Sequence, residues 1–127
     1  MPELGPVRTS TPADPAMARV LRMVTMGIAA SAGFTVDRVD DVALATTEAF
    51  SIVIATPGTA SVECVAKAEM GRISVQMTSV AETVGESSSD PWPIDPLADR
   101  VLRSVTDQVD YEMGPTRVAF AVIARSS

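Results

Sequence analysis

The residue whose type and position could do chemistry is Glu48, in the middle of the segment Asp40 to Thr56. At helical spacing this segment places core-forming side chains on one face and aspartates opposite, and Glu48 lies where the pattern turns inward. The core-facing positions are Val39, Val42, Ala43, Thr46, Ala49, Phe50 and Val53. An isolated carboxylate beside an apolar surface costs free energy unless it is paired, hydrated or used in a reaction. We predict a helix in which Glu48 is either used in a reaction or is a boundary residue of the core.

The absence of histidine and the single cysteine exclude several kinds of active site. The chain has no histidine, which removes histidine-activated nucleophiles, phosphohistidine chemistry and histidine-ligated metals. Cys64 is the one cysteine and cannot form an internal disulfide. Because its neighbours alternate between apolar and polar types, as in a strand, we predict a buried structural thiol. We expect no metal site.

Length and charge indicate the class of protein. The 127 residues fit one domain, spanning residues 1–127, with a flexible N-terminal segment over residues 1–5. The net charge of −6 argues against direct nucleic-acid binding and favours a basic protein partner. Neither a signal peptide nor an uncharged run approaching the ~20 residues of a membrane span is present, so we expect a cytoplasmic protein without membrane contact.

The pattern of apolar residues, prolines and glycines predicts the elements. Asp14-Pro15 and Asp95-Pro96 are helix starts, Gly33 is a left-handed helix end, and Thr35 can cap the second helix. The expected elements are an edge strand over residues 6–10, helices over 15–32 and 35–56, a hairpin of strands over 62–69 and 72–78, a third helix whose buried face runs from Leu97 to Val109, and a last strand over 116–124.

A polar segment from Ser79 to Ile94, rich in Ser, Glu and Pro, is predicted to form a lid-like loop. Trp92 lies between two prolines of this loop and either anchors it to the body or contacts a partner. The last strand is apolar at successive positions, so we expect it to be central and partly covered on both faces. The order of elements predicts an α+β two-layer sandwich, with helices packed on one face of a mixed, mostly antiparallel sheet.

Four stretches carry a resemblance to a known family: the segment around Glu48, Ala18 to Val20, Leu102 to Val109, and Glu112 to Thr116. In their order and spacing they resemble the GHKL ATP-binding superfamily (histidine kinase-like ATPases) and, within it, the anti-sigma factor kinases of the RsbW/SpoIIAB type. The resemblance covers nearly the whole chain. It implies a Bergerat (GHKL-like) fold, with ATP bound in a cleft between the helices and a loop, and a general base at Glu48.

The nucleotide-binding motifs of that family are altered in this sequence. The position of the magnesium-binding Asn is Ile52, and the adenine-binding D-x-G corresponds to Ser79 and Ala81. The glycine-rich phosphate motif before the third helix is replaced by Asp95-Pro96, which lacks an amide donor and repels phosphate. Thr116 is a further position of the pocket. We therefore expect a degenerate ATP site, with ATP and magnesium binding disfavoured and Glu48 only a vestigial base.

The resemblance also implies partners. Family members sequester a sigma factor, are antagonised by an anti-anti-sigma factor and usually form homodimers. Arg19 matches a family position that contacts sigma, although an ordinary solvated arginine is an equal interpretation. Arg22, Met23 and Met26 lie near it and are candidates for the same surface or for a dimer surface. The leading hypothesis is an anti-sigma factor that binds its partner without catalysis.

Two alternatives remain open. The first is an active serine-protein kinase that phosphorylates an anti-anti-sigma factor, with Glu48 as base and Ser79, Ser104 or Thr116 replacing lost contacts. The second is a protein that binds an anti-anti-sigma factor or another regulator without contacting any sigma factor. Magnesium-dependent ATP binding separates the first alternative from the leading hypothesis, and co-purification of partners separates the second.

Overall fold

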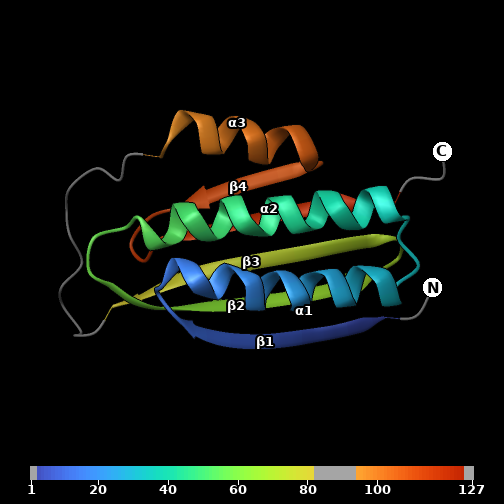
Figure 1. Cartoon of the computed structure of the whole chain (residues 1–127), viewed down its shortest axis with the longest axis horizontal. Helices are drawn as coiled ribbons and strands as arrows, with labels where there is room; N and C mark the ends of the chain where they lie inside the picture. The colour runs from blue at the N-terminus through green and yellow to red at the C-terminus, as the bar shows by residue number, and fades with distance from the viewer. Residues whose placement is uncertain (1–2, 82–93, 125–127) are drawn as a thin grey trace.

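A computed structural model describes residues 3–81 and 94–124 and places three α-helices on one side of a five-stranded sheet (Figure 1). The elements are β1 (Leu4–Pro12), the 3-10 turn η1 (Pro15–Met17), α1 (Ala18–Ser31), α2 (Val36–Ile54), β2 (Thr59–Glu69), β3 (Arg72–Ala81), α3 (Pro96–Val105), β4 (Gln108–Glu112) and β5 (Arg117–Ile123). The strand order is β1-β2-β3-β5-β4, and every described pairing is antiparallel. The predicted α+β class is confirmed, but the sheet is antiparallel rather than mixed.

Local capping chemistry explains where α2, α3 and the 3-10 turn before α1 begin. The first helix was predicted from residue 15, but residues 15–17 form the 3-10 turn and α1 begins at Ala18. The carboxylates of Asp14 and Asp95 accept hydrogen bonds from backbone amides two residues on, at 2.9 and 3.0 Å. The Thr35 hydroxyl accepts one from the amide three residues on, at 3.2 Å. These bonds satisfy amides that have no partner within the first helical turn. Gly33 follows α1 with a φ of +86°, as predicted for a left-handed helix end.

The hydrophobic core lies between the helices and one face of the sheet. α1 packs on β2, α2 on β3 and β5, and α3 beside β4 (Figure 1). Alternate residues of the β2–β3 hairpin are buried against the helices, so the predicted hairpin is confirmed. Cys64 is 1% exposed, which confirms the predicted buried thiol, and burial raises its pKa to about 11.

The third helix is shorter than predicted, because it ends at Val105 rather than at Val109. Thr106 has an extended backbone, and the amide of Asp107 donates to the carbonyl oxygen of Ala121 at 2.9 Å. This bond begins the pairing of the chain with β5. Val109 therefore lies in β4, where it is half-buried against the core.

Two other predicted boundaries are corrected. The lid-like loop does not begin at Ser79, because Ser79 to Ala81 complete β3 in register with β2. Residues 82–93, which include Trp92, lie outside the described residues. The predicted edge strand is confirmed, but β1 begins at Leu4, so part of the segment predicted to be flexible over residues 1–5 belongs to a strand.

A polar network fixes the first turn of α2 to the C-terminal half of the sheet. Arg38 donates to Asp41 at 2.9 Å, to Asp107 at 2.7 Å and to the carbonyl oxygen of Ile123 at 3.1 Å. Asp107 also accepts from the amide of Ile123 at 2.8 Å. Because the guanidinium is mostly buried and every contact is a charge-assisted hydrogen bond, the network holds α2 in a single position on β5.

Candidate functional site

Glu48 lies half-buried on α2, where the helix turns from the core towards solvent. Within residues 3–81 and 94–124 it has no ion-pair or hydrogen-bond partner. Its neighbour Ala49 is fully buried. The carboxylate therefore lies at the boundary of the core, an arrangement that suits both predicted interpretations of Glu48.

The predicted nucleotide-pocket positions are mostly packed into the protein. Ile52 is 3% exposed and belongs to the hydrophobic core. Ser79 and Thr116 are also buried, and the structure brings them together, since the amide of Ser79 donates to the carbonyl oxygen of Thr116 at 2.9 Å. Ala81 is exposed at the end of β3, apart from this contact. These positions present little free hydrogen-bonding capacity to a ligand.

The N-terminus of α3 is occupied by the protein's own carboxylates. Asp95 caps the helix by accepting from the amide of Leu97 at 3.0 Å, Pro96 has no amide hydrogen, and Asp99 lies in the first turn. A helix N-terminus attracts phosphate through free amides and positive potential. Here a carboxylate takes one amide and supplies negative charge, so the terminus does not favour a phosphate.

A cluster at the edge of the helical layer joins α3 to β4. The Tyr111 hydroxyl donates to Asp99 at 2.5 Å, Arg103 donates to the same carboxylate at 2.9 Å, and its guanidinium lies 5.6 Å from the centre of the Tyr111 ring. Burial and, secondarily, the hydrogen bond to Asp99 raise the pKa of Tyr111. Sequence analysis missed this cluster, although Asp99 and Arg103 have the spacing of a helical ion pair. Its role is to fix α3 on the sheet.

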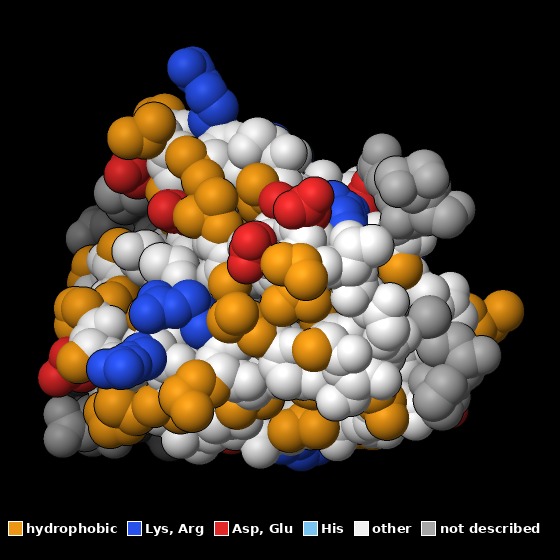
Figure 2. Space-filling model, turned by 45° about the vertical axis from the view of Figure 1, so that its right-hand side comes forward, with side chains coloured by type: hydrophobic (Ala, Val, Ile, Leu, Met, Phe, Trp, Pro, Cys, Tyr) orange, Lys and Arg blue, Asp and Glu red, His pale blue; other side chains and the backbone are white. Residues whose placement is uncertain are grey.

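Four of the predicted partner-binding residues, Arg19, Arg22, Met23 and Met26, lie on α1 beside the exposed Val20. We define the α1 surface as Arg19, Val20, Arg22, Met23 and Met26. Met23 is 69% exposed, Arg19 is exposed, and Met26 is half-buried. Figure 2 shows basic side chains beside hydrophobic ones on this side of the molecule. α1 contains no acidic residue, in a chain whose net charge is −6, so this surface is locally basic and apolar.

Residues of α2 that sequence analysis missed complete the α1 surface. Thr47 accepts a hydrogen bond from the Arg22 guanidinium at 3.1 Å, which limits the orientations of that side chain. Leu44, on the same helix, is 41% exposed and adds apolar area. Beneath them, the buried hydroxyls of Thr25 and Thr46 lie 2.8 Å apart and connect the two helices. Contacts between two helices cannot be identified from a single sequence.

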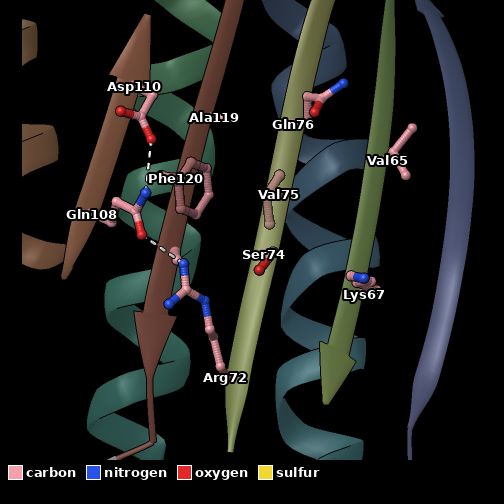
Figure 3. A pocket seen from close by; sticks show the side chains of 11 residues that line it. Val65, Lys67, Arg72, Ser74, Val75, Gln76, Gln108, Asp110, Ala119 and Phe120 are labelled. Atoms are coloured by element: carbon pink, nitrogen blue, oxygen red, sulfur yellow. Dashed lines mark hydrogen bonds between the residues drawn. The ribbon is translucent and has the colours of Figure 1, made fainter. Parts of the chain in front are cut away.

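The opposite face of the sheet carries a shallow hollow of about 180 Å³ (Figure 3). Its lining includes Ala119 and Ala121 of β5. At its rim, Arg72 donates to the Gln108 side-chain oxygen at 2.7 Å, and the Gln108 amide donates to Asp110 at 2.9 Å. The chain of bonds crosses β5 from β3 to β4 and places charged groups around an uncharged centre. None of the residues predicted to act lies here.

Within the described ranges, no group of three or more His, Cys, Asp or Glu side chains could hold a metal ion. No helix in the described part of the chain is long and apolar enough to cross a membrane. The sequence matches no model of a known protein family and no curated protein.

Proposed function

We propose that this chain is an anti-sigma factor of the RsbW/SpoIIAB type, with a GHKL-like fold, which sequesters a sigma factor by protein binding and no longer phosphorylates. Three helices on one face of an antiparallel sheet, in this chain order, are compatible with that fold. The partners we propose are a sigma factor and an anti-anti-sigma factor, in a homodimeric cytoplasmic protein that binds no nucleic acid directly.

The observation that carries the proposal is the α1 surface. Exposed methionine and valine side chains are unfavourable in water and adapt to the shape of a partner. Arg19 has no carboxylate partner among the described residues, and Arg22 is oriented by Thr47. Arginine and large apolar side chains together are the composition of energetically important interface residues. A partner segment with acidic and apolar side chains would complement them, whereas the net charge of the whole chain favours a basic partner.

The packing of the nucleotide positions supports binding without catalysis. Phosphoryl transfer depends on positioning and on neutralising phosphate charge. In this chain Ile52 fills the core where the family has a magnesium ligand, and Asp95 caps the helix that would approach phosphate. Glu48 alone supplies a base without the groups that would bring a nucleotide to it.

Binding to purified alternative sigma factors from the same organism tests the proposal. We expect one of them to form a complex, and Arg19→Glu to weaken that complex at least roughly tenfold, because the substitution places negative charge in a basic surface. Arg100→Glu is the matched control, since Arg100 is also exposed but lies on α3. Absence of any complex, or equal effects of the two substitutions, would contradict the proposal.

Calorimetry with magnesium and ATP tests the kinase alternative separately. We expect no heat of binding at millimolar nucleotide, because the pocket positions are buried or occupied. A saturable binding isotherm that is lost in Glu48→Gln would favour an active serine-protein kinase. The same titration with the Ile52→Asn variant tests whether a polar side chain at this position restores binding of ATP and magnesium.

A further inference from the structure

β1 is an edge strand of the sheet, and no strand of the described part of the chain pairs with its outer side (Figure 1). The amide of Ala13 donates to the carbonyl oxygen of Ala60 at 3.1 Å, and this bond continues the register of β1 with β2. In an antiparallel pair, the backbone N–H and C=O groups of alternate residues point to the partner strand, and those of the residues between point away. Ala13 belongs to the first set, which places Arg8 and Ser10 in the second, with their backbone groups pointing outwards.

Pro12 supports the same assignment, because a residue without an N–H group lies at an outward-pointing position, where no bond to β2 is lost. At the other end, the irregular register between Leu4 and Val7 interrupts the regular pairing. Between these limits, the N–H and C=O groups of Arg8 and Ser10 have no hydrogen-bond partner within the described residues. The β1 edge therefore offers a short row of donors and acceptors to another extended backbone.

Apolar side chains lie beside this edge on the helix side of the sheet. Val7 pairs with the buried Ala66 and is 38% exposed, and Val20 of α1 is exposed to the same extent. The Arg22 guanidinium reaches Thr47 of α2, and Val20 lies two residues before Arg22, on the opposite flank of α1. This flank faces β1, because α1 lies between α2 and the β1 edge (Figure 1). A strand added beside β1 would cover both valines.

Charged side chains lie beside the edge on the other face of the sheet. Arg8 and Ser10 pair there with Val65 and Glu63 of β2. Arg8 and Glu63 are exposed, and neither has an ion-pair partner within the described residues. An acidic residue opposite Arg8 on an added strand would pair with it directly. A long basic side chain opposite Ser10 would reach Glu63 over the short serine, because neighbouring strands are only about 4.8 Å apart.

We propose that the β1 edge binds an extended segment of a partner protein by strand addition. The segment pairs antiparallel with Arg8 and Ser10, as the described strands of this sheet pair with one another. In its own chain direction it carries a basic residue opposite Ser10, an apolar residue, an acidic residue opposite Arg8 and a second apolar residue. The apolar side chains then lie on the helix side, beside Val7 and Val20. This proposal does not rest on the proposed function, since it requires no sigma factor.

Two peptides of equal composition test the proposal: Thr-Lys-Val-Glu-Val-Thr and the charge-exchanged Thr-Glu-Val-Lys-Val-Thr. Titration of the first into isotope-labelled protein should shift the NMR amide signals of Arg8 and Ser10 saturably. We expect a dissociation constant on the order of 1 mM, because the paired window is short. The charge-exchanged peptide should bind at least roughly threefold more weakly. No saturable shift, shifts that leave β1 unaffected, or equal or tighter binding of the exchanged peptide would overturn the proposal.

Methylation of the peptide backbone tests the hydrogen bonds without changing the protein. In antiparallel addition, the amides of the lysine and the glutamate point to β1, and those of the two valines point away from it. N-methylation of the lysine and glutamate amides should abolish binding, whereas N-methylation of the valine amides should leave it unchanged. The reverse result, or equal loss of binding with both methylated peptides, would overturn strand addition.

A pair of substitutions at Ser10 tests the protein side of the same bonds. Ser10→Pro removes the outward donor without removing a bond to β2, and should weaken binding of the first peptide at least roughly fivefold. Ser10→Ala keeps the donor and should bind as the unmodified protein does. Circular dichroism checks that both variants are folded, and the methylated peptides decide if Ser10→Pro is not. Equal binding by the two variants would overturn the proposal, as would a change in the mass of the peptide-free protein on Ser10→Pro, which would show a second copy on this edge.

Discussion

The two faces of the sheet are built from alternate residues of the same strands, yet they have different roles. On β2 and β3, Cys64 and Met77 are almost fully buried beneath the helices. Their neighbours Val65 and Gln76 are half-exposed on the opposite face of the sheet, which we call the open face. Stability comes mainly from apolar area removed from water. The helix-covered face therefore holds the fold together, and the open face is free to carry recognition.

The outer side of the helical layer resembles the open face more than it resembles the core. On α1, Leu21 and Thr25 are fully buried, but Met23 projects into solvent. The polar contact from Arg22 to Thr47 orients one side chain without burying the surface. The chain therefore has two outward surfaces, one on each side of its core.

The largest expected difference between the two faces is in the free energy of unfolding lost on substitution of Met77 and of Gln76. Met77→Ala should reduce the free energy of unfolding by roughly 2–5 kcal/mol, because it leaves a cavity in the core. Gln76→Ala should change it by less than about 0.5 kcal/mol, as expected for a surface side chain. Urea unfolding measures both free energies. Similar losses of unfolding free energy in the two variants would contradict the conclusion that the helix-covered face holds the fold together.

The thiol of Cys64 gives a second test, because its pH-dependent contribution to the free energy of unfolding is about 2 kcal/mol. Burial raises its pKa from the usual 9.0 to about 11, so the folded state favours the protonated thiol. The resulting stability is fully present below pH ~8.5 and is lost as the pH rises through the folded-state pKa. The difference in unfolding free energy between the unmodified protein and Cys64→Ala, followed from pH 8 to about pH 11, should therefore shrink by this amount.

Reaction with a thiol reagent at pH 8 compares the two faces directly. Cys64 should react only as fast as the protein unfolds, because thiolate formation and access are both suppressed. A cysteine at the next position, in Cys64→Ala/Val65→Cys, should react at the rate of an ordinary surface thiol. Equal rates at the two positions would show that the helices do not seal this face.

Much of the helical layer could be predicted from local chemistry. Asp14, Thr35 and Asp95 identify the helix starts because each cap acts on an amide two or three residues away. The end of α3 could not be predicted, because it depends on bonds from Asp107 to residues far away in sequence, such as Arg38. Apolar periodicity alone continues through this point to Val109.

The candidate surfaces were predictable to different degrees. Helical spacing places Arg19 and Met23 away from the core, as observed, but the contribution of Leu44 requires the packing of α2 against α1. Alternation indicates which residues of the hairpin face solvent. The register that aligns Arg8 with Asp110 across the sheet depends on the order of all five strands, which no local pattern specifies.

The smallest expected effect, at Gly27, separates stability from recognition on α1. An added Cβ there meets no atom within 4 Å, so Gly27→Ala should stabilise the helix by roughly 0.5–1 kcal/mol through lower backbone entropy in the unfolded state. Gly33→Ala is the matched control: it also has open space, but its φ of +86° makes alanine strained and destabilising. Thermal unfolding measures both. If Gly27→Ala stabilises the protein but weakens a sigma complex, a partner approaches the α1 backbone closely; if it leaves the complex unchanged, recognition depends on the neighbouring side chains alone.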